Sequence, residues 1–351
     1  MSSLRISLSS ALAAGLAALL LSSSPLAAPP TQAQPHPAAG TYKQDPGPFK
    51  VEVRLYDWTD AKRGRSVPVK VYFPADSKNG SPLIVLSHGL GGSREGYEYI
   101  GRHWAGHGYI SLHIQHVGSD DAVWREQARP MPAMKQAAAD PMNAVNRVRD
   151  VSFVIDQMEK LNAGPGDLKD RVDLGRVGVA GHSFGANTTL VAAGQIFLLP
   201  GGRELGFADP RIKAAVPMSA PVPRNKNELG RAFGKIAVPC LHMTGTLDAS
   251  LIGETPAADR RLPFDHINGA DQYLIVFNGG DHMIFSGRAR APAAAGQREK
   301  DKVFQDLIRQ SSTAFWDAYL KGDAGGKRWL AEGGCESSLG SDGTFEKKIK
   351  R

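Results

Sequence analysis

The chain has 351 residues, of which 42% are hydrophobic and 22% are charged, and its formal net charge is +7. This profile is that of a soluble globular protein, and a single α/β domain can reach this length. Residues of both signs are interspersed, and no basic run is interleaved with aromatic residues. The sequence therefore argues against nucleic acid as a partner.

The first 33 residues have the pattern of a secretory signal peptide. An early arginine precedes an apolar run over residues 8–21, and Thr31 and Ala33 suit the −3 and −1 positions of a cleavage site. The run is short for a membrane span, which needs about 20 residues. We therefore expect a secreted or periplasmic protein with no stable membrane insertion.

Eight segments that follow have the pattern of β-strands. Residues 49–58 and 65–74 alternate apolar and polar positions, as half-buried strands at a sheet edge do. The other six are apolar throughout, which is typical of parallel strands buried on both faces. These six runs cover residues 81–89, 108–116, 176–183, 212–220, 238–245 and 272–280.

Helical spacing of apolar residues over 142–161 and 302–320 predicts helices between and after the strands. Alternating strands and helices predict the α/β class, with a mostly parallel, doubly wound sheet and an antiparallel N-terminal pair of strands. We expect residues 34–351 to form a single domain. The polar tail from about residue 322 is expected to be mobile, except where Cys335 holds it.

The strand at 176–183 ends in GHSFGAN, which contains the pattern G-x-S-x-G. This short pattern is informative only where a buried strand meets a helix. Here Val177 and Val179 precede it, and a helical pattern from Thr188 through Leu198 follows it. The context predicts a sharp turn that holds Ser183 exposed above the sheet, with the positive end of a helix dipole behind it.

The loop after the third strand, LSHGLGGSRE, is the second element of the predicted site. Where a serine lies in such a turn, the oxyanion hole takes one backbone N–H from this loop and one from the residue after the nucleophile. Leu90 and Phe184 are therefore the predicted donors, and His88 is expected to shape the loop. The motif G-x-x-x-x-G-K-[ST] is absent, so phosphate binding by such a loop is excluded.

His282 is the predicted general base, because it follows the last strand in LIVFNGGDHMIF and satisfies the chain order Ser, Asp, His. His182 adjoins Ser183, but consecutive residues at a strand end point to opposite sides. His103, His107, His113 and His116 are interpreted as packing or capping residues, and His242 lies within a predicted core strand. No H-E-x-x-H pattern occurs, so no metal is expected.

Asp248 is the predicted acid, because it follows the strand in CLHMTGTLDAS and can orient the imidazole. Three alternatives lie between the serine and the histidine. Asp281 is too close to His282 in sequence to reach its far ring nitrogen easily. Asp265 and Asp271 have no strand end before them.

Taken together, these residues resemble the α/β-hydrolase superfamily over nearly the whole mature chain. The segments HGLGGSREGYEYIGRHWAGHGY and GHSFGAN are similar to the serine-dependent platelet-activating-factor acetylhydrolases and the bacterial predicted dienelactone hydrolases. The resemblance implies hydrolysis of short or oxidised acyl esters by Ser183, Asp248 and His282, through an acyl-enzyme and without a cofactor. True dienelactone hydrolases have cysteine in place of Ser183, which argues against lactone specificity.

Bacterial polyester hydrolases and cutinases share this fold and a related turn, usually with methionine where Phe184 stands. Three functions therefore stay open: a secreted serine esterase, a polyester depolymerase, and an inactive hydrolase fold that serves as a binding module. A serine peptidase is less favoured, because no separate peptide-binding domain is evident.

Two further expectations concern the surroundings of the site. Residues 118–142 are longer than a connection needs, so they either cover one wall, with Trp124 as an apolar substrate contact, or form a surface excursion. Only about 17 residues, 221–237, separate two strands where other hydrolases insert a helical cap, so the site should be open. Cys240 and Cys335 are a candidate disulfide in an exported protein.

Overall fold

The computed structural model describes residues 40–77, 80–125, 127–250, 252–253, 255–288 and 295–350. The predicted signal peptide lies outside these residues. The described residues belong to one compact unit. None of their helices has the length and apolar character that crossing a membrane requires.

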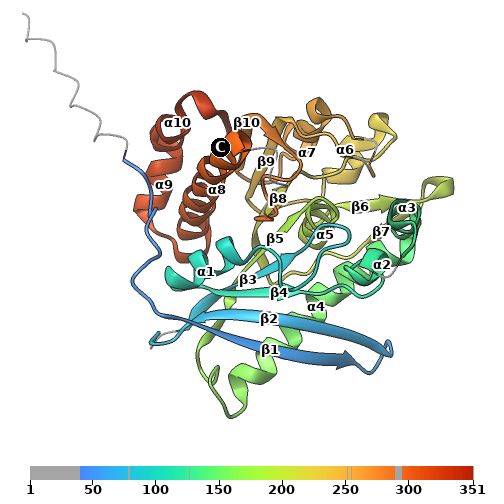
Figure 1. Cartoon of the computed structure of the whole chain (residues 1–351), viewed down its shortest axis with the longest axis horizontal. Coiled ribbons are helices and arrows are strands. Elements are labelled where there is room, and N and C mark those ends of the chain that lie inside the picture. Colours follow the sequence, from blue (N-terminus) through green and yellow to red (C-terminus); the bar gives the residue numbers. More distant parts are fainter. Residues whose placement is uncertain are drawn as a thin grey trace, which may run out of the picture. The chain divides into compact units, whose positions relative to one another are not determined.

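One mixed sheet organises the described part of the chain (Figure 1). The strand order is β1-β2-β4-β3-β5-β8-β9-β10-β11, and the six strands from β4 to β10 run parallel to one another. The flanking strands β1, β2 and β11 are antiparallel to their neighbours. The strands are β1 Val51–Asp60, β2 Arg65–Pro74, β3 Ser81–Ser87, β4 Ile110–Ile114, β5 Val172–His182, β8 Ile212–Met218, β9 Cys240–Leu247, β10 Gln272–Asp281 and β11 Gly343–Lys348. The predicted fold class is thereby confirmed.

Helices cover both faces of this sheet (Figure 1). One face packs against α4 Pro141–Ala163, α5 Phe184–Ala193 and α6 Leu229–Phe233. The other packs against α1 Glu98–Gly106, α8 Ala295–Trp316, α9 Ala324–Ala331 and α10 Gly334–Leu339. Shorter elements are α2 Ala122–Arg125, α3 Pro130–Ala139, α7 Leu262–His266 and the hairpin of β6 Ile196–Leu198 and β7 Glu204–Gly206.

The alternation of side chains along each strand creates two apolar cores. In β5, Val177 and Val179 point into the core under α4 and α5, whereas Ala180 points into the core under α8. Because both faces are covered, most residues of the central strands are buried, and β3 and β4 are buried throughout. Each fully buried valine or leucine stabilises the fold by about 1.5–3 kcal/mol relative to an exposed one.

Two sequence predictions of local structure are wrong. The helix after Ser183 ends at Ala193 rather than at Leu198, because Gly194 takes a positive φ of 127° and the chain turns into the β6–β7 hairpin. The tail after residue 322 is ordered, since it forms α9, α10 and β11. Its Phe345 stacks on Tyr273 with ring centroids 5.8 Å apart.

The predicted disulfide is not formed in the structure, where Cys240 and Cys335 are both free and buried. Cys240 begins β9 and belongs to the core under α4, α5 and α6. Cys335 lies on α10 and belongs to the opposite core. The sheet separates the two thiols, because strand alternation points Cys240 to one face and the next residue to the other.

Candidate active site

Side chains from three parallel strands meet at one edge of the sheet. Ser183 follows β5, Asp248 follows β9 and His282 follows β10. These strands lie close together in the sheet, with β8 between β5 and β9. The carboxyl ends of parallel strands form the edge at which open α/β sheets bind their ligands.

The turn at Ser183 is strained and depends on glycine at two positions. Ser183 has φ 56° and ψ −117°, a conformation that L-residues rarely adopt. A Cβ atom on Gly185 would overlap the carbonyl oxygen of Ser87, and one on Gly181 would overlap that of Gly185. The absence of these side chains lets β5, α5 and β3 pack closely and keeps the serine at the edge.

The serine, the histidine and the aspartate form a continuous line of hydrogen bonds. Nε2 of His282 lies 2.9 Å from Oγ of Ser183, and Nδ1 lies 2.8 Å from Oδ1 of Asp248. Asp248 is fully buried, whereas 17% of the His282 side chain is exposed. A neutral imidazole in this place can accept the hydroxyl proton while its other nitrogen donates to the carboxylate.

Asp248 is surrounded by donors. Its Oδ1 accepts from the hydroxyl of Ser219 at 2.8 Å, its Oδ2 accepts from that of Thr244 at 2.8 Å, and Arg260 lies 3.1 Å away. Burial raises the pKa of Asp248, but the hydrogen bond from His282, the charge of Arg260 and the Ser219 hydroxyl outweigh it and hold the pKa below 3.8. The group therefore stays a carboxylate at neutral pH.

Sequence reasoning missed Ser219 and Arg260. Ser219 follows β8 with φ 57°, and its hydroxyl also lies 2.8 Å from Nδ1 of His282. Arg260 is almost fully buried and donates to the backbone carbonyls of Asp248 and Ser219, each at 2.7 Å. The position of Ser219, at the end of the strand between β5 and β9, is the one sequence signal that could have identified it.

His182 packs beside the line of hydrogen bonds without joining it. Its ring centroid is 4.7 Å from that of His282, and its Nδ1 is 2.9 Å from the hydroxyl of Tyr97. The same hydroxyl accepts from the backbone N–H of Gly89 at 3.1 Å. Burial holds the pKa of His182 well below 6.5, so His182 is a neutral packing partner of His282.

The backbone N–H groups of Leu90 and Phe184 have no acceptor among the described residues. Phe184 is the first residue of α5, and the first N–H groups of any helix lack an intrahelical partner. Leu90 lies in a turn closed by the Gly92 N–H, which donates to Gly89 at 3.0 Å. Both groups are free to donate to an anionic oxygen.

The segment 118–142 forms α2 and α3, and Trp124 on α2 fastens it to the loop that carries Leu90. The indole Nε1 of Trp124 donates to the carbonyl of Gly91 at 2.8 Å. The Gly91 N–H in turn donates to the carbonyl of Ser119 at 2.9 Å. Trp124 is half-buried by these contacts, and its role as a substrate contact stays a prediction.

An apolar cavity of about 550 Å³ borders the helix that follows Ser183. Asn187, one turn beyond the serine, contributes to its wall. The remaining lining comes from the start of α4, the β6–β7 hairpin and the chain after β8: Pro141, Ala144, Val145, Gln195, Ile196, Phe197, Leu198, Leu199, Leu205, Pro221, Val222, Pro223, Arg224, Asn225, Glu228 and Ala232.

The alternative acids lie in other contacts. Asp265 pairs with Arg261 at 3.1 Å, Asp271 accepts from the Tyr319 hydroxyl at 2.7 Å, and Asp281 accepts from the N–H of the residue after His282. Across the described ranges, no group of three or more histidine, cysteine, aspartate or glutamate side chains is arranged to hold a metal ion.

The parallel sheet, the strained serine turn between strand and helix, and the histidine after the last parallel strand define an α/β hydrolase. The chain belongs to the PET hydrolase-like family, whose model matches residues 26–294.

Two kinds of named relative are similar to this chain at low identity. A platelet-activating factor acetylhydrolase of Canis lupus familiaris is 28% identical over 142 residues, which is 32% of this chain and 32% of that protein. The same-named protein of Cavia porcellus is 26% identical over 313 residues, covering 78% of this chain and 66% of that protein. A cutinase of Thermobifida fusca is 24% identical over 257 residues, covering 72% and 69%.

Proposed function

We propose that this protein is a serine hydrolase that cleaves carboxylic esters through an acyl-enzyme intermediate. The observation that carries the proposal is the line of two hydrogen bonds from Ser183 through His282 to the buried carboxylate of Asp248. Membership of the PET hydrolase-like family supports it.

In the acylation step, Oγ of Ser183 attacks the ester carbonyl carbon and its proton passes to Nε2 of His282. The carbonyl oxygen becomes an oxyanion, which the N–H groups of Leu90 and Phe184 stabilise. His282 then gives the proton to the departing alkoxide, so that an alcohol leaves and the acyl group stays on Ser183. Water repeats the sequence and releases the acid. Asp248 keeps its charge throughout and stabilises the imidazolium.

The substrate we favour is an ester with a short or oxidised acyl chain and a large alcohol part. The segment 221–237 forms only a short 3₁₀ turn and α6, Leu229–Phe233, which is too little to build a cap. An uncapped site gains little from each additional methylene, whereas full burial is worth about 0.8 kcal/mol per CH₂. The relatives named platelet-activating factor acetylhydrolase are consistent with such a substrate.

A polyester chain is the second candidate. Two observations favour it: the family model describes PET hydrolase-like proteins, and an apolar cavity of about 550 Å³ adjoins the serine helix. A repeat unit of a polymer could place its apolar part in that cavity while the rest of the chain stays in solvent. A secreted or periplasmic location, as the N-terminal sequence predicts, suits either substrate.

The test is a panel of esters from acetate to palmitate, with polyester films included, assayed with the wild type and Ser183→Ala. We expect acetate and butyrate esters to be hydrolysed at least as fast as longer ones, and Ser183→Ala to be inactive but folded. Release of soluble products from films would select the polyester candidate. A steady rise in kcat/KM from butyrate to palmitate would contradict the open site, and a folded but inactive wild type would favour a binding module.

A further inference from the structure

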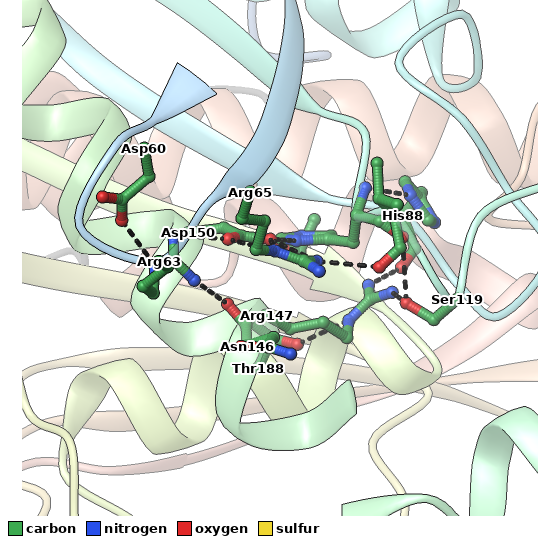
Figure 2. A network of polar contacts seen from close by, with 12 residues as sticks. Asp60, Arg63, Arg65, His88, Ser119, Asn146, Arg147, Asp150 and Thr188 are labelled. Atoms are coloured by element: carbon green, nitrogen blue, oxygen red, sulfur yellow. Dashed lines mark hydrogen bonds and ion pairs between the residues drawn. The ribbon is translucent and has the colours of Figure 1, made fainter. Parts of the chain in front are cut away.

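Arg147 on α4 is a fully buried arginine that donates hydrogen bonds to three separate segments of the chain. Its Nε donates to Oγ1 of Thr188 at 3.0 Å, its Nη1 donates to Oγ of Ser119 at 2.9 Å, and its Nη2 donates to the backbone carbonyl of His88 (Figure 2). The guanidinium carbon also lies 4.6 Å from the ring centroid of Phe184. Each of the three guanidinium nitrogens therefore donates to one of these neighbours.

These contacts converge on the two N–H groups proposed as the oxyanion hole. The His88 carbonyl lies two residues before Leu90, on the same loop. On the other side, the hydroxyl of Thr188 donates a hydrogen bond to the carbonyl of Phe184 at 3.0 Å. Arg147 therefore holds the first turn of α5 both through Thr188 and through the Phe184 ring. One guanidinium thus contacts both donor segments, which are the loop that carries Leu90 and the first turn of α5, which carries Phe184.

The third contact supports the same loop. The backbone carbonyl of Ser119 accepts from the N–H of Gly91, the residue after Leu90, at 2.9 Å. The loop is consequently held by Arg147 on both sides of Leu90, directly at His88 and through Ser119. His88 is fixed further, because its Nε2 accepts from the backbone N–H of His116 at 3.1 Å.

A neighbouring carboxylate would be the usual reason for a buried arginine, and Asp150 lies in the same network (Figure 2). The carboxylate of Asp150, however, contacts other partners: Arg63 at 2.8 Å, Arg65 at 2.9 Å and His116 at 2.9 Å. Among the described residues Arg147 has no ion pair and donates to neutral oxygens only. Burial lowers its pKa to about 9, so it still carries its charge at neutral pH.

We propose that Arg147 is a positioning residue that sets the separation and direction of the Leu90 and Phe184 N–H groups, so that both point at the oxyanion. This inference rests on the proposed function. A buried charge kept without a carboxylate partner destabilises the fold, whereas a planar fork with five donors is suited to fixing three acceptors at once. Because the hole must be formed before the charge develops, a shift of about 1 Å in one donor can reduce the rate by about 100-fold.

The test compares Arg147→Lys with the wild type on a short ester. Lysine keeps the charge but cannot bridge three oxygens, so we expect kcat to fall by about 10- to 100-fold with KM changed by less than about threefold. The pH profile should keep its shape, because Arg147 contacts neither His282 nor Asp248. A purely structural role would instead lower the amount of folded protein and leave kcat per folded molecule unchanged.

Arg65→Lys is the matched control. Arg65 is also a largely buried arginine of this network, but it donates to Asp150 and to the carbonyl of Val117 and touches neither donor segment. It should lose stability and keep kcat within about threefold of the wild type. If Arg147→Lys lowers kcat no more than Arg65→Lys does, or changes KM alone, the inference is overturned.

Thr188→Val tests the positioning role of Arg147 if Arg147→Lys does not fold. Valine matches the shape of threonine but removes the oxygen that links Arg147 to the Phe184 carbonyl, and we expect kcat to fall by about 3- to 10-fold. An unchanged kcat would overturn the proposal.

If the wild type hydrolyses esters through Ser183 while these variants match it, only the role of Arg147 fails. If the wild type shows no esterase activity, the proposed function fails and this inference with it.

Discussion

Mild acid should destabilise this protein, because several histidines are buried in their neutral form. Burial lowers the pKa from 6.5 to about 4 for His113 and His242, and to about 3 for His103 and His116. In the unfolded chain these groups take up protons as the pH falls through about 6.5, whereas the folded chain excludes those protons until about pH 4. The free energy of unfolding therefore decreases as the pH falls between these values.

The magnitude follows from linkage. At pH 5.5, one unit below the unfolded value, each excluded proton lowers the free energy of unfolding by about 1.4 kcal/mol, so four groups lower it by about 6 kcal/mol. A typical domain has only about 5–15 kcal/mol in total. Urea unfolding followed by tryptophan fluorescence should therefore show a much lower midpoint at pH 5.5 than at pH 7.5.

One variant tests the origin of this loss. His103→Leu removes one of the four groups, whose Nε2 is buried without a partner among the described residues, and should reduce the loss by about a quarter. Equal urea midpoints at pH 7.5 and pH 5.5 would refute the reasoning.

Three further predictions concern Ser219, Gly185 and the two cysteines. Ser219→Ala removes a hydrogen bond to the buried carboxylate, so kcat should fall about tenfold in a folded protein, and a kcat equal to that of the wild type would count against its supporting role. Gly185→Ala should give no soluble folded protein on size-exclusion chromatography, because its Cβ would overlap the Ser87 carbonyl. Cys240 and Cys335 should not react with a thiol reagent in the native state and should both react in guanidinium; a disulfide would leave neither reactive.

The three proposed catalytic residues could be predicted because each lies in a local sequence pattern that identifies it. Ser183 lies in a glycine-flanked turn between a strand and a helix, and Asp248 and His282 each follow an apolar strand in the expected chain order. Strand ends are local features, and parallel strands bring their carboxyl ends to one edge whatever the loops do. The sequence therefore predicts that these three residues lie together at one edge of the sheet.

The supporting residues lie in no such local sequence pattern. Arg147 and Arg260 act on backbone carbonyls of distant segments, and neither a motif nor a helical face identifies a carbonyl as their partner. The disulfide prediction failed because cysteine count carries no information on which face of the sheet a thiol takes. The polar composition of the tail predicts mobility, yet β11 needs only alternate apolar contacts, such as that of Phe345, to pair with β10.

Labelling with a fluorophosphonate, followed by peptide mass spectrometry, tests the central claim most directly. The reagent modifies a serine only where a base activates it and donors stabilise the oxygen on phosphorus. The account predicts one adduct, on Ser183, that is absent in Ser183→Ala and forms far more slowly in His282→Ala. An adduct on another residue such as Ser219, or a folded protein in which Ser183 stays unmodified, would contradict it.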